Sequence, residues 1–369
     1  MNKRLLCSLL VLLLFVLSGC LETRIVDEVS MIRAAAFDLD KEKGLKFTVT
    51  FPTFPEQGQE QELQQGIISA TGETAKGTRI SLNKQSQKPI RFGQLRLLLF
   101  SQELAEQGVE NTVRAMYRDP SVGNRILLAV AEGSEAGAML DSDLGIGELA
   151  GVYIPELIEQ NNDTSILPPT NMHEFLFSLY NDGRDPYLPM LEQTEDDRIL
   201  VIGTALFDGE RYHSKLDLND SFILKMMIDT TRQAVQQFEV EYEGEQSYVV
   251  LDKLHSDVKR NLDKSGDVPV FTLDISIKGA IEDYDGKMNL DQADIIKEME
   301  QSIEEQIANR GEELLVQFQE GGIDPVGMGE KYRSTTRDWN PEEWESFLYP
   351  SAEFNVHVDV KIIQSGAIE

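Results

Sequence analysis

The most constraining feature of the sequence is a pair of alternating segments separated by a long amphipathic helix. Residues 271–278 and 354–362 alternate apolar and polar side chains, which is typical of strands with one buried and one solvent-exposed face. Between them, apolar residues recur at helical spacing along one stripe, which comprises Ile295, Met299, Ile303, Ile307, Leu314 and Phe318. The pattern predicts a C-terminal sheet packed against one long helix.

The predicted helix has sequence signals at both ends. Asn289 is expected to be its N-cap, with Gln292 in the capping-box position, and Gly321 is expected to end it. At 1.5 Å per residue, its roughly 31 residues would span about 46 Å. That length predicts a bend or a break near residues 309–311.

The N-terminal part of the chain alternates strand and helix signals. Residues 32–37 and 45–51 flank a polar turn and predict a β-hairpin, and a polar helix is predicted over 74–85. The almost unbroken apolar run 95–100 is typical of a strand covered on both faces, and 126–131 is interpreted as a second buried strand. The helical segment between these two strands predicts a right-handed crossover and a parallel pair.

Short polar segments are interpreted as caps and turns. Ser101 is expected to cap the helix that follows the first buried strand. The turn at 38–44 resembles a calcium loop only superficially. The sixth and twelfth positions of an EF-hand would be Lys43 and Val49, where glycine and a carboxylate are required. The turn is therefore interpreted as part of the hairpin.

These patterns divide the chain into consecutive parts. Residues 1–19 are interpreted as a signal peptide, 20–195 as an α/β lobe, 196–221 as a connecting hairpin and 222–369 as a sheet-plus-helix domain. The segment 161–195, rich in Asn, Asp and Pro, is predicted to be an irregular join between lobes that holds one amphipathic piece around 174–180. The predicted fold class is α+β. It has a mixed-sheet N-terminal lobe with βαβ crossovers and a C-terminal lobe of antiparallel-type strands packed on one long helix.

The N-terminus has the features of a lipoprotein signal peptide. Lys3 and Arg4 precede an apolar stretch over 5–17, and Gly19 supplies the small residue before Cys20. About 13 apolar residues fall short of the roughly 20 needed to cross a hydrocarbon core. Cleavage between Gly19 and Cys20 would leave Cys20 with an S-diacylglycerol and an N-acyl chain such as palmitate, which anchors the protein on the outer face of a membrane.

Net charge and cysteine content restrict the partners and the stabilising bonds. The chain has 64 acidic and 34 basic residues, a formal charge of −30. Such a surface repels nucleic acid and anionic lipid headgroups, so the partner is expected to be a protein or a small molecule. Cys7 leaves with the signal peptide and Cys20 is consumed by lipid, so no disulfide is predicted.

No catalytic constellation is found in the sequence. The segment 145–150 has dinucleotide-loop spacing without the strand that should precede it, and the Ser-x-x-Lys pairs at 81–84 and 256–259 lack their partner motifs. The histidine residues are scattered, and none has a second His or Cys at ligand spacing: His173, His213, His255 and His357. We therefore predict no catalytic residue, metal or cofactor, and a protein that is not an enzyme.

An aromatic-rich segment lies between the long helix and the last strand. It contains Trp339, Trp344, Phe347 and Tyr349. Two interpretations are open at this stage. Either these side chains pack back on the sheet, or they are exposed anchors for a partner protein, since aromatic residues dominate protein interfaces.

Several segments, in order, resemble the C-subunit lipoproteins of bacterial spore germinant receptors. They follow the lipidated cysteine and extend to the end of the chain: 22–28, 34–40, 72–74, 92–100, 104–108, 118–120, 203–207, 322–329 and Trp344 with the closing strand. Two positions depart from the family. Leu21 stands where an aromatic residue is usual, and Gln94 where a histidine is usual. The departures remove no catalytic group, because the family is not enzymatic.

The resemblance implies a role in sporulation and spore germination. It implies a receptor complex in the spore inner membrane, where this lipoprotein would assemble with a large membrane subunit and a transporter-like subunit that binds the nutrient. The alternative is a solute-binding lipoprotein of a transporter. That alternative requires two similar α/β lobes around a cleft, whereas the two halves of this chain have different patterns.

Overall fold

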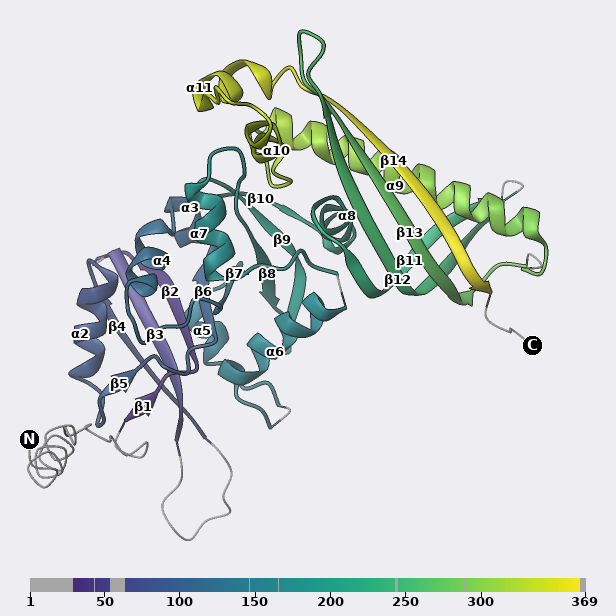
Figure 1. Cartoon of the computed structure of the whole chain (residues 1–369). Helices are drawn as coiled ribbons and strands as arrows, with labels where there is room; N and C mark the ends of the chain where they lie inside the picture. Colours follow the sequence, from purple (N-terminus) through teal and green to yellow (C-terminus); the bar gives the residue numbers. More distant parts are fainter. Residues whose placement is uncertain are drawn as a thin grey trace, which may run out of the picture.

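The computed structural model describes residues 29–42, 44–53, 64–145, 147–164, 166–242, 245–287 and 290–365. They form two lobes of an α+β fold, shown in Figure 1 from purple at the N-terminus to yellow at the C-terminus. The N-terminal lobe contains a mixed eight-stranded sheet, and the C-terminal lobe contains a four-stranded sheet with a long helix beside it.

The eight-stranded sheet has the order β10-β9-β8-β7-β6-β2-β3-β4. Strands β2, β6, β7 and β8 are parallel to one another, and antiparallel strands flank them on both sides. Its strands are β2 (Ala34–Asp40), β3 (Gly44–Thr53), β4 (Gln64–Gly72), β6 (Leu97–Ser101), β7 (Leu127–Glu132), β8 (Tyr187–Gln193), β9 (Ile199–Asp208) and β10 (Arg211–Leu216). A separate small parallel pair joins β1 (Ser30–Met31) to β5 (Ile90–Arg91).

Helices cover both faces of this sheet, as the apolar run before Ser101 predicted. Leu98 and Phe100 of β6 belong to the core under one group of helices, and Leu97 and Leu99 to the core under the other. The first group is α2 (Ala75–Asn83), α3 (Gln102–Gln107), α4 (Glu110–Tyr117) and α7 (Met172–Tyr180), and the second is α5 (Ala136–Leu140) and α6 (Ala150–Asp163). The predicted hairpin, the parallel pair β6–β7 and the Ser101 cap are confirmed.

In the turn that superficially resembles a calcium loop, the first carboxylate, Asp38, binds backbone N–H groups. Asp38 is buried and accepts hydrogen bonds from the backbone N–H groups of Ala136 (2.6 Å) and Gly137 (2.9 Å). These are the first N–H groups of α5, which a helix cannot satisfy internally. Asp38 therefore fixes the start of α5 to the hairpin.

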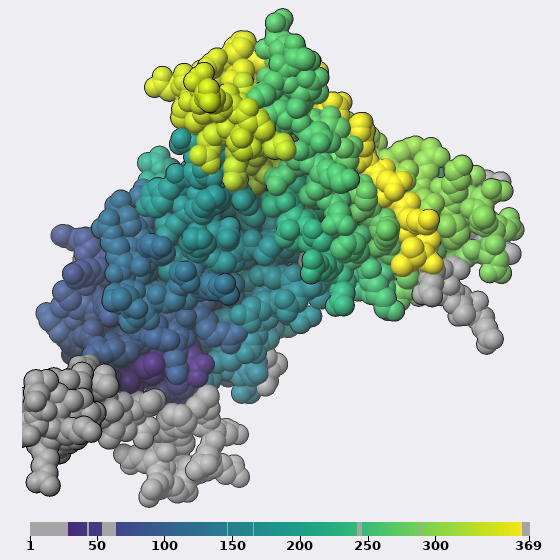
Figure 2. All heavy atoms as spheres, in the orientation of Figure 1, coloured from purple at the N-terminus to yellow at the C-terminus, as the bar shows by residue number. Residues whose placement is uncertain are grey.

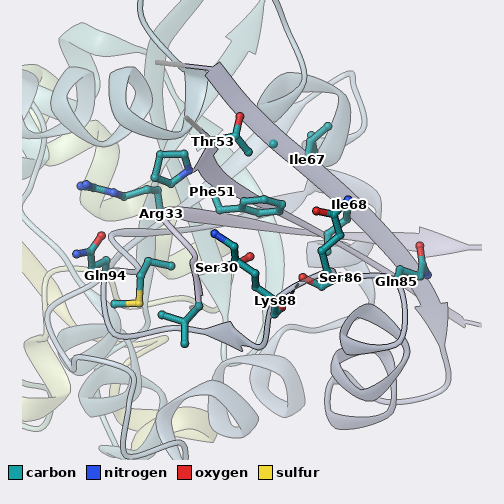
Figure 3. Close-up of a pocket in the computed structure, with 15 residues that line it drawn as sticks. Ser30, Arg33, Phe51, Thr53, Ile67, Ile68, Gln85, Ser86, Lys88 and Gln94 are labelled. Atoms are coloured by element: carbon teal, nitrogen blue, oxygen red, sulfur yellow. Dashed lines mark hydrogen bonds between the residues drawn. The ribbon is translucent and has the colours of Figure 1, made fainter. Parts of the chain in front are cut away.

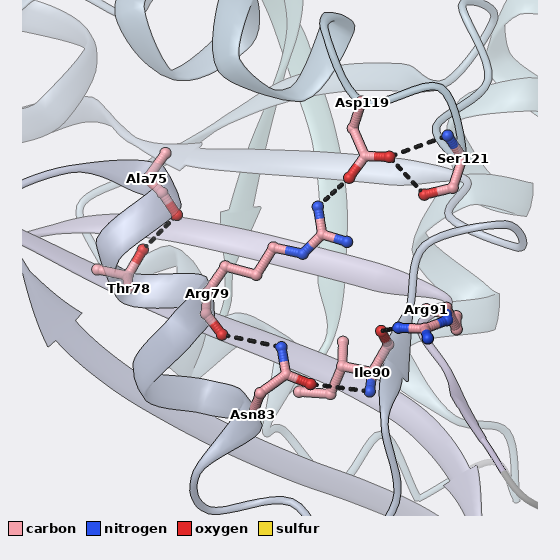
Figure 4. A network of polar contacts seen from close by, with 8 residues as sticks. All are labelled: Ala75, Thr78, Arg79, Asn83, Ile90, Arg91, Asp119 and Ser121. Atoms are coloured by element: carbon pink, nitrogen blue, oxygen red, sulfur yellow. Dashed lines mark hydrogen bonds and ion pairs between the residues drawn. The ribbon is translucent and has the colours of Figure 1, made fainter.

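A polar network fastens α2 to the loop after α4 (Figure 4). Arg79 pairs with Asp119, and its guanidinium lies 4.5 Å from the ring centroid of Phe92. Asp119 also accepts from the backbone N–H (2.9 Å) and hydroxyl (2.7 Å) of Ser121. Because Asp119 lies in the 118–120 segment, that segment has a packing role in the N-terminal lobe.

The irregular join predicted over 161–195 is wrong. The expected amphipathic piece around 174–180 lies in α7, but the segment also contains β8, a buried strand of the eight-stranded sheet. Asn171 accounts for part of the misleading composition, since its side chain caps α7 by accepting from His173 N–H (2.9 Å) and Glu174 N–H (3.1 Å). The predicted hairpin after it forms as β9 and β10, and these strands extend the same sheet.

The C-terminal lobe has the strand order β11-β12-β13-β14. Strands β11 (Thr231–Tyr242), β12 (Glu245–Asp263) and β13 (Val270–Tyr284) are antiparallel, and β14 (Glu353–Ser365) is parallel to β13. The last pair differs from the expected antiparallel type because helix α9 (Ala293–Glu320) returns the chain to the starting end of the sheet. The remaining elements are α8 (Leu218–Ile228), α10 (Met328–Ser334), α11 (Pro341–Glu343) and a π-helical turn (Trp344–Leu348).

Of the bend or break predicted near 309–311, the break does not occur, because α9 is one continuous α-helix. Gln292 stands at its N-cap position without a side-chain capping hydrogen bond, and Asn289, the predicted N-cap, lies outside the described residues. Its 28 residues span about 42 Å, and the 13 residues of β14 extend over about 43 Å, so the helix and the strand match in length. Gly311 faces β14, where an added Cβ would lie 3.4 Å from Val356.

Helix α9 also covers the edge of the four-stranded sheet. Glutamate side chains of α9 accept hydrogen bonds from outward backbone N–H groups of β14: Glu312 from Val356, Glu304 from Val360 and Glu300 from Ile362, at 2.8–2.9 Å. Unpaired edge groups are sites of unwanted strand pairing. These contacts occupy them within the chain.

Candidate functional site at the junction between the lobes

The two lobes share one hydrophobic core. Tyr187, Leu206 and Leu216 of the eight-stranded sheet belong to the same buried cluster as Phe222 of α8 and Phe271 of β13. In the space-filling view, green and yellow atoms of the C-terminal lobe pack directly against teal atoms of the N-terminal lobe (Figure 2). The junction is therefore a packed interior that fixes how one lobe lies against the other.

Asp324 organises the loop that approaches the junction from the C-terminal lobe. Its side chain is 4% exposed and accepts from the backbone N–H groups of Gly327 (2.8 Å), Met328 (3.0 Å) and Gly329 (2.7 Å). Gly327 has φ +82°, a left-handed conformation that glycine adopts without strain. The turn exposes successive N–H groups toward one carboxylate, which satisfies groups that would otherwise be buried without partners.

Asp185 continues this network from the N-terminal lobe. Its carboxylate accepts from the backbone N–H of Asp324 (2.8 Å) and from that of Gly209 (3.1 Å), and its own N–H donates to the carbonyl of Asp324 (2.9 Å). Two carboxylates thus tie the loop after α9 to the β8 and β9 segments. The sequence did not predict that these two residues pair, although Asp324 lies in the 322–329 segment of the family resemblance.

Burial governs the electrostatics of this pair. Desolvation raises the pKa of Asp324 to about 7, against the opposing hydrogen bonds from Gly329 and Met328. Desolvation also raises the pKa of Asp185 above its ordinary value. On the C-terminal side, Arg260 donates to the Val326 carbonyl (2.8 Å), and burial lowers the pKa of Arg260.

A contact between two glycines brings the lobes together. A Cβ added to Gly329 would lie 2.5 Å from the Cα of Gly183, and one added to Gly183 would lie 2.5 Å from the carbonyl carbon of Gly329. Gly183 has φ +90°, and its carbonyl accepts from the N–H of Glu330 (2.8 Å). Backbones this close leave no room for a side chain on either residue.

The aromatic segment completes the junction. Trp344 is 3% exposed and Tyr349 is 5% exposed, and their ring centroids lie 5.3 Å apart. Tyr349 donates its hydroxyl to the Ile323 carbonyl (2.6 Å), and Trp344 packs edge-on against Phe271 (6.1 Å). Our docking hypothesis needs correction for these two residues, because their burial keeps them from the reach of a partner.

The other two aromatic residues of the segment lie farther out. Trp339 is half-buried against Tyr332 and Trp344, and Phe347 is 56% exposed. The interpretation that the segment packs back on the sheet therefore holds for its buried residues, Trp344 and Tyr349. Phe347 is the member of the docking set that solvent reaches most.

The junction offers backbone-binding carboxylates and no assembled reactive group. Among the described residues, no cluster of three or more His, Cys, Asp or Glu side chains is placed to hold a metal. The histidine residues stay apart: His213 contacts Ser214, His255 contacts Asp257, His357 contacts Asp274, and His173 is exposed on α7. The oxygen atoms of Asp324 are already used by N–H groups, so the arrangement acts as a structural clamp.

A pocket of about 570 Å³ lies at the opposite end of the N-terminal lobe (Figure 3). Phe51 and Ile68 supply apolar lining, and Arg33, Lys88 and Gln94 supply polar groups. The lining contains no histidine, cysteine or carboxylate. The pocket thus presents two cationic side chains, Arg33 and Lys88, without a histidine or carboxylate that could act as a general acid or base.

One signal for the junction was present in the sequence. Asp324 is followed by glycine at the third and fifth positions, within the 322–329 segment that carries part of the family resemblance. Gly19 and Cys20 lie outside the described residues. Within the parts of the chain that are described, every helix is too short or too polar to cross a membrane.

The fold and junction define a class of two-lobe α+β proteins in which a mixed sheet and a helix-covered sheet share one core. Two family models match the chain in succession. The model described as spore germination protein N-terminal domain matches residues 22–193, and the one described as spore germination B3/GerAC like, C-terminal, matches residues 202–366. The protein belongs to this GerAC-like family of spore germination proteins.

Relatives match it over nearly its whole length. The spore germination protein GerQC of Bacillus cereus is 30% identical over 353 residues, 96% of each chain. YfkR of Bacillus subtilis (strain 168) is 21% identical over 384 residues, 98% of this chain and 97% of its own. The crystal structure of the GerBC protein has the same fold, with a TM-score of 0.56 at 14% identity, and covers 89% of this chain and 96% of its own.

Proposed function

We propose that this protein is a lipid-anchored, non-catalytic subunit of a nutrient germinant receptor in the spore inner membrane. It acts in germination by assembling with membrane-embedded partner subunits. The observation that carries the proposal is the full-length similarity to GerQC, 30% identical over 96% of both chains and spanning both lobes. A match to one lobe alone would support a shared domain, whereas this match supports a shared role.

The lipid anchor is supported by the N-terminal sequence and by charge. Gly19 and Cys20 follow a basic tip and a short apolar stretch, and Ser30 begins the first described strand ten residues after Cys20. The formal charge of −30 gives the protein no general attraction to anionic lipid. Two or more acyl chains at Cys20 are then needed for stable attachment.

A non-catalytic role is supported by the way the junction uses its buried acids. Buried Asp324 accepts hydrogen bonds from backbone N–H groups of its own loop, and half-buried Asp185 accepts one from Gly209 and one, across the lobes, from Asp324. A solute-binding role would need two similar lobes that open around a ligand cleft. Here, an eight-stranded and a four-stranded sheet share one core, an arrangement that suits a rigid adaptor.

The test is a pair of cysteine variants in the spore-forming host. Cys20→Ala removes the lipidated thiol, so we expect loss of labelled palmitate incorporation, release from the membrane fraction and slow nutrient germination. Cys7→Ala removes a cysteine of the signal peptide itself and should leave all three readouts unchanged. Full labelling of the Cys20→Ala protein, or normal germination of spores that lack the gene, would contradict the proposal.

A further inference from the structure

A groove between helices α4 and α7 is a surface feature that the junction and the fold do not explain. The groove has a volume of about 690 Å³. Arg114, Tyr117 and Arg118 line it from α4 and its C-cap, and His173, Phe177 and Tyr180 line it from α7. We call it the α4–α7 groove.

The aromatic residues of the groove are not needed to build the core. Helix α7 buries its other side through Met172 and Phe175, while Phe177 and Tyr180 remain 44% and 58% exposed. Across the groove, Tyr117 is 48% exposed. Of the five exposed aromatic side chains among the described residues, three thus converge on one groove. Exposed apolar groups gathered in this way mark interaction sites.

The charge of the groove is opposite to that of the protein. No carboxylate lines it, although the chain has 64 acidic and 34 basic residues. Arg118 is exposed, and no ion pair with it is present in the described part of the chain. Arg114 is paired with Glu110 (3.0 Å), so Arg118 is the cation open to a partner.

Hydrogen bonds hold the two walls together before any partner binds. Tyr180 of α7 donates its hydroxyl to Glu110 of α4 (2.9 Å), and Arg114 donates to Glu110 (3.0 Å) and Asn111 (2.7 Å). A site with its side chains already ordered loses less conformational entropy on binding. The groove is therefore preorganised to receive apolar side chains beside a free guanidinium.

We propose that the α4–α7 groove docks an acidic segment of a partner protein, in which a carboxylate lies next to an apolar or aromatic side chain. The carboxylate pairs with Arg118, and the apolar side chain packs between Tyr117 and Phe177. The proposal rests on the proposed function and deepens it, because it names the chemistry by which this subunit recognises a partner. A lipid surface fits less well, since the protein as a whole is acidic.

The test uses random 12-residue peptides displayed on phage and selected on the full-length lipidated protein in detergent. We expect enrichment of peptides with Asp or Glu beside Leu, Phe or Trp. Their affinity should fall at least tenfold in the double variant Arg118→Glu with Phe177→Ser, and should weaken as NaCl rises from 50 to 300 mM. The matched control is Lys76→Glu with Ile80→Ser on the exposed face of α2, which makes the same changes and should bind as the native protein does.

Other outcomes overturn the inference. They are the absence of acidic–apolar enrichment, equal binding by the groove variant, or groove-dependent binding to phosphatidylglycerol vesicles in place of peptides. Spores provide a second readout. The groove variant should remain in the membrane fraction and germinate at least tenfold more slowly. If the groove variant germinates normally while spores that lack the gene germinate poorly, the docking role of the groove is refuted and the proposed function stands. If spores that lack the gene germinate normally, the proposed function itself is refuted.

Discussion

The aromatic residues of the junction and those of the α4–α7 groove have opposite environments. Trp344 and Tyr349 are 3% and 5% exposed, whereas Phe177 and Tyr180 are 44% and 58% exposed. The junction residues come from one short stretch of sequence. The groove joins Tyr117 to Phe177, which are 60 positions apart in the chain.

The difference follows from the structural role of each group of aromatic residues. The segment after α9 must fill the space where the helix, the sheet and the N-terminal lobe meet, and large rings fill it through contacts such as Trp344 with Phe271 and Tyr349. A surface site needs no such clustering in sequence, because tertiary packing brings its residues together. The buried pair Trp344 and Tyr349 is close in sequence, whereas the exposed rings of the proposed docking surface come from two packed helices.

The largest expected effect is that of Trp344→Ala. Removing a buried indole leaves a cavity at the centre of the junction, so we expect a loss of about 3–5 kcal/mol in the free energy of unfolding. Phe347→Ser, three positions along and 56% exposed, should change it by about 0.5 kcal/mol or less. Urea unfolding followed by tryptophan fluorescence or circular dichroism measures both. Equal effects of the two substitutions would remove the distinction between buried and exposed members of the segment.

A second, smaller effect is expected from Gly183→Ala. Its methyl group would meet the backbone of Gly329 and would also be strained at φ +90°, which together should cost about 2–4 kcal/mol. Gly209→Ala is the matched control, since Gly209 has φ +54° and open space at its Cβ position. It should lose only about 1 kcal/mol. Thermal unfolding of the two variants isolates the cost of separating the lobes, and equal losses would mean that the glycine contact is unimportant.

Much of the fold follows from local patterns in the sequence. The apolar run of β6 predicted a strand covered on both faces. The alternation in β13 and β14 predicted a sheet with one buried and one solvent-exposed face. The errors arose where polar residues have structural uses. Asn171 caps α7 within a segment that resembled a linker.

The junction was harder to predict because its pairing is non-local. Asp185 and Asp324 lie 139 positions apart, and each acid alone resembles one of many surface carboxylates. The same holds for the α4–α7 groove, whose residues have ordinary helical spacing on each helix. Only the packing of α4 beside α7 places Arg118 and Phe177 in one concave site.

The junction should also respond to pH through Asp324. Burial raises the pKa of this carboxyl to about 7 in the folded state, above its ordinary value of 3.8. The folded state therefore holds more protons than the unfolded state between these values, and stability from this group is present at low pH and lost as pH rises through about 7. Asp263, exposed at the end of β12, should act in the opposite direction, because hydrogen bonds from Ser265 lower its pKa.

The smallest effect is expected from Asp324→Asn, and its direction with pH is the informative result. The amide resembles the neutral acid but loses one acceptor for the N–H of Gly329, which should cost about 1–3 kcal/mol at pH 5. That cost should shrink by pH 8, where the native protein carries a buried charge that the variant lacks. Urea unfolding at both pH values measures it, with Asp263→Asn as the control of opposite sign. A cost for Asp324→Asn that grows with pH would show that the N–H groups of the loop stabilise the carboxylate more than burial destabilises it.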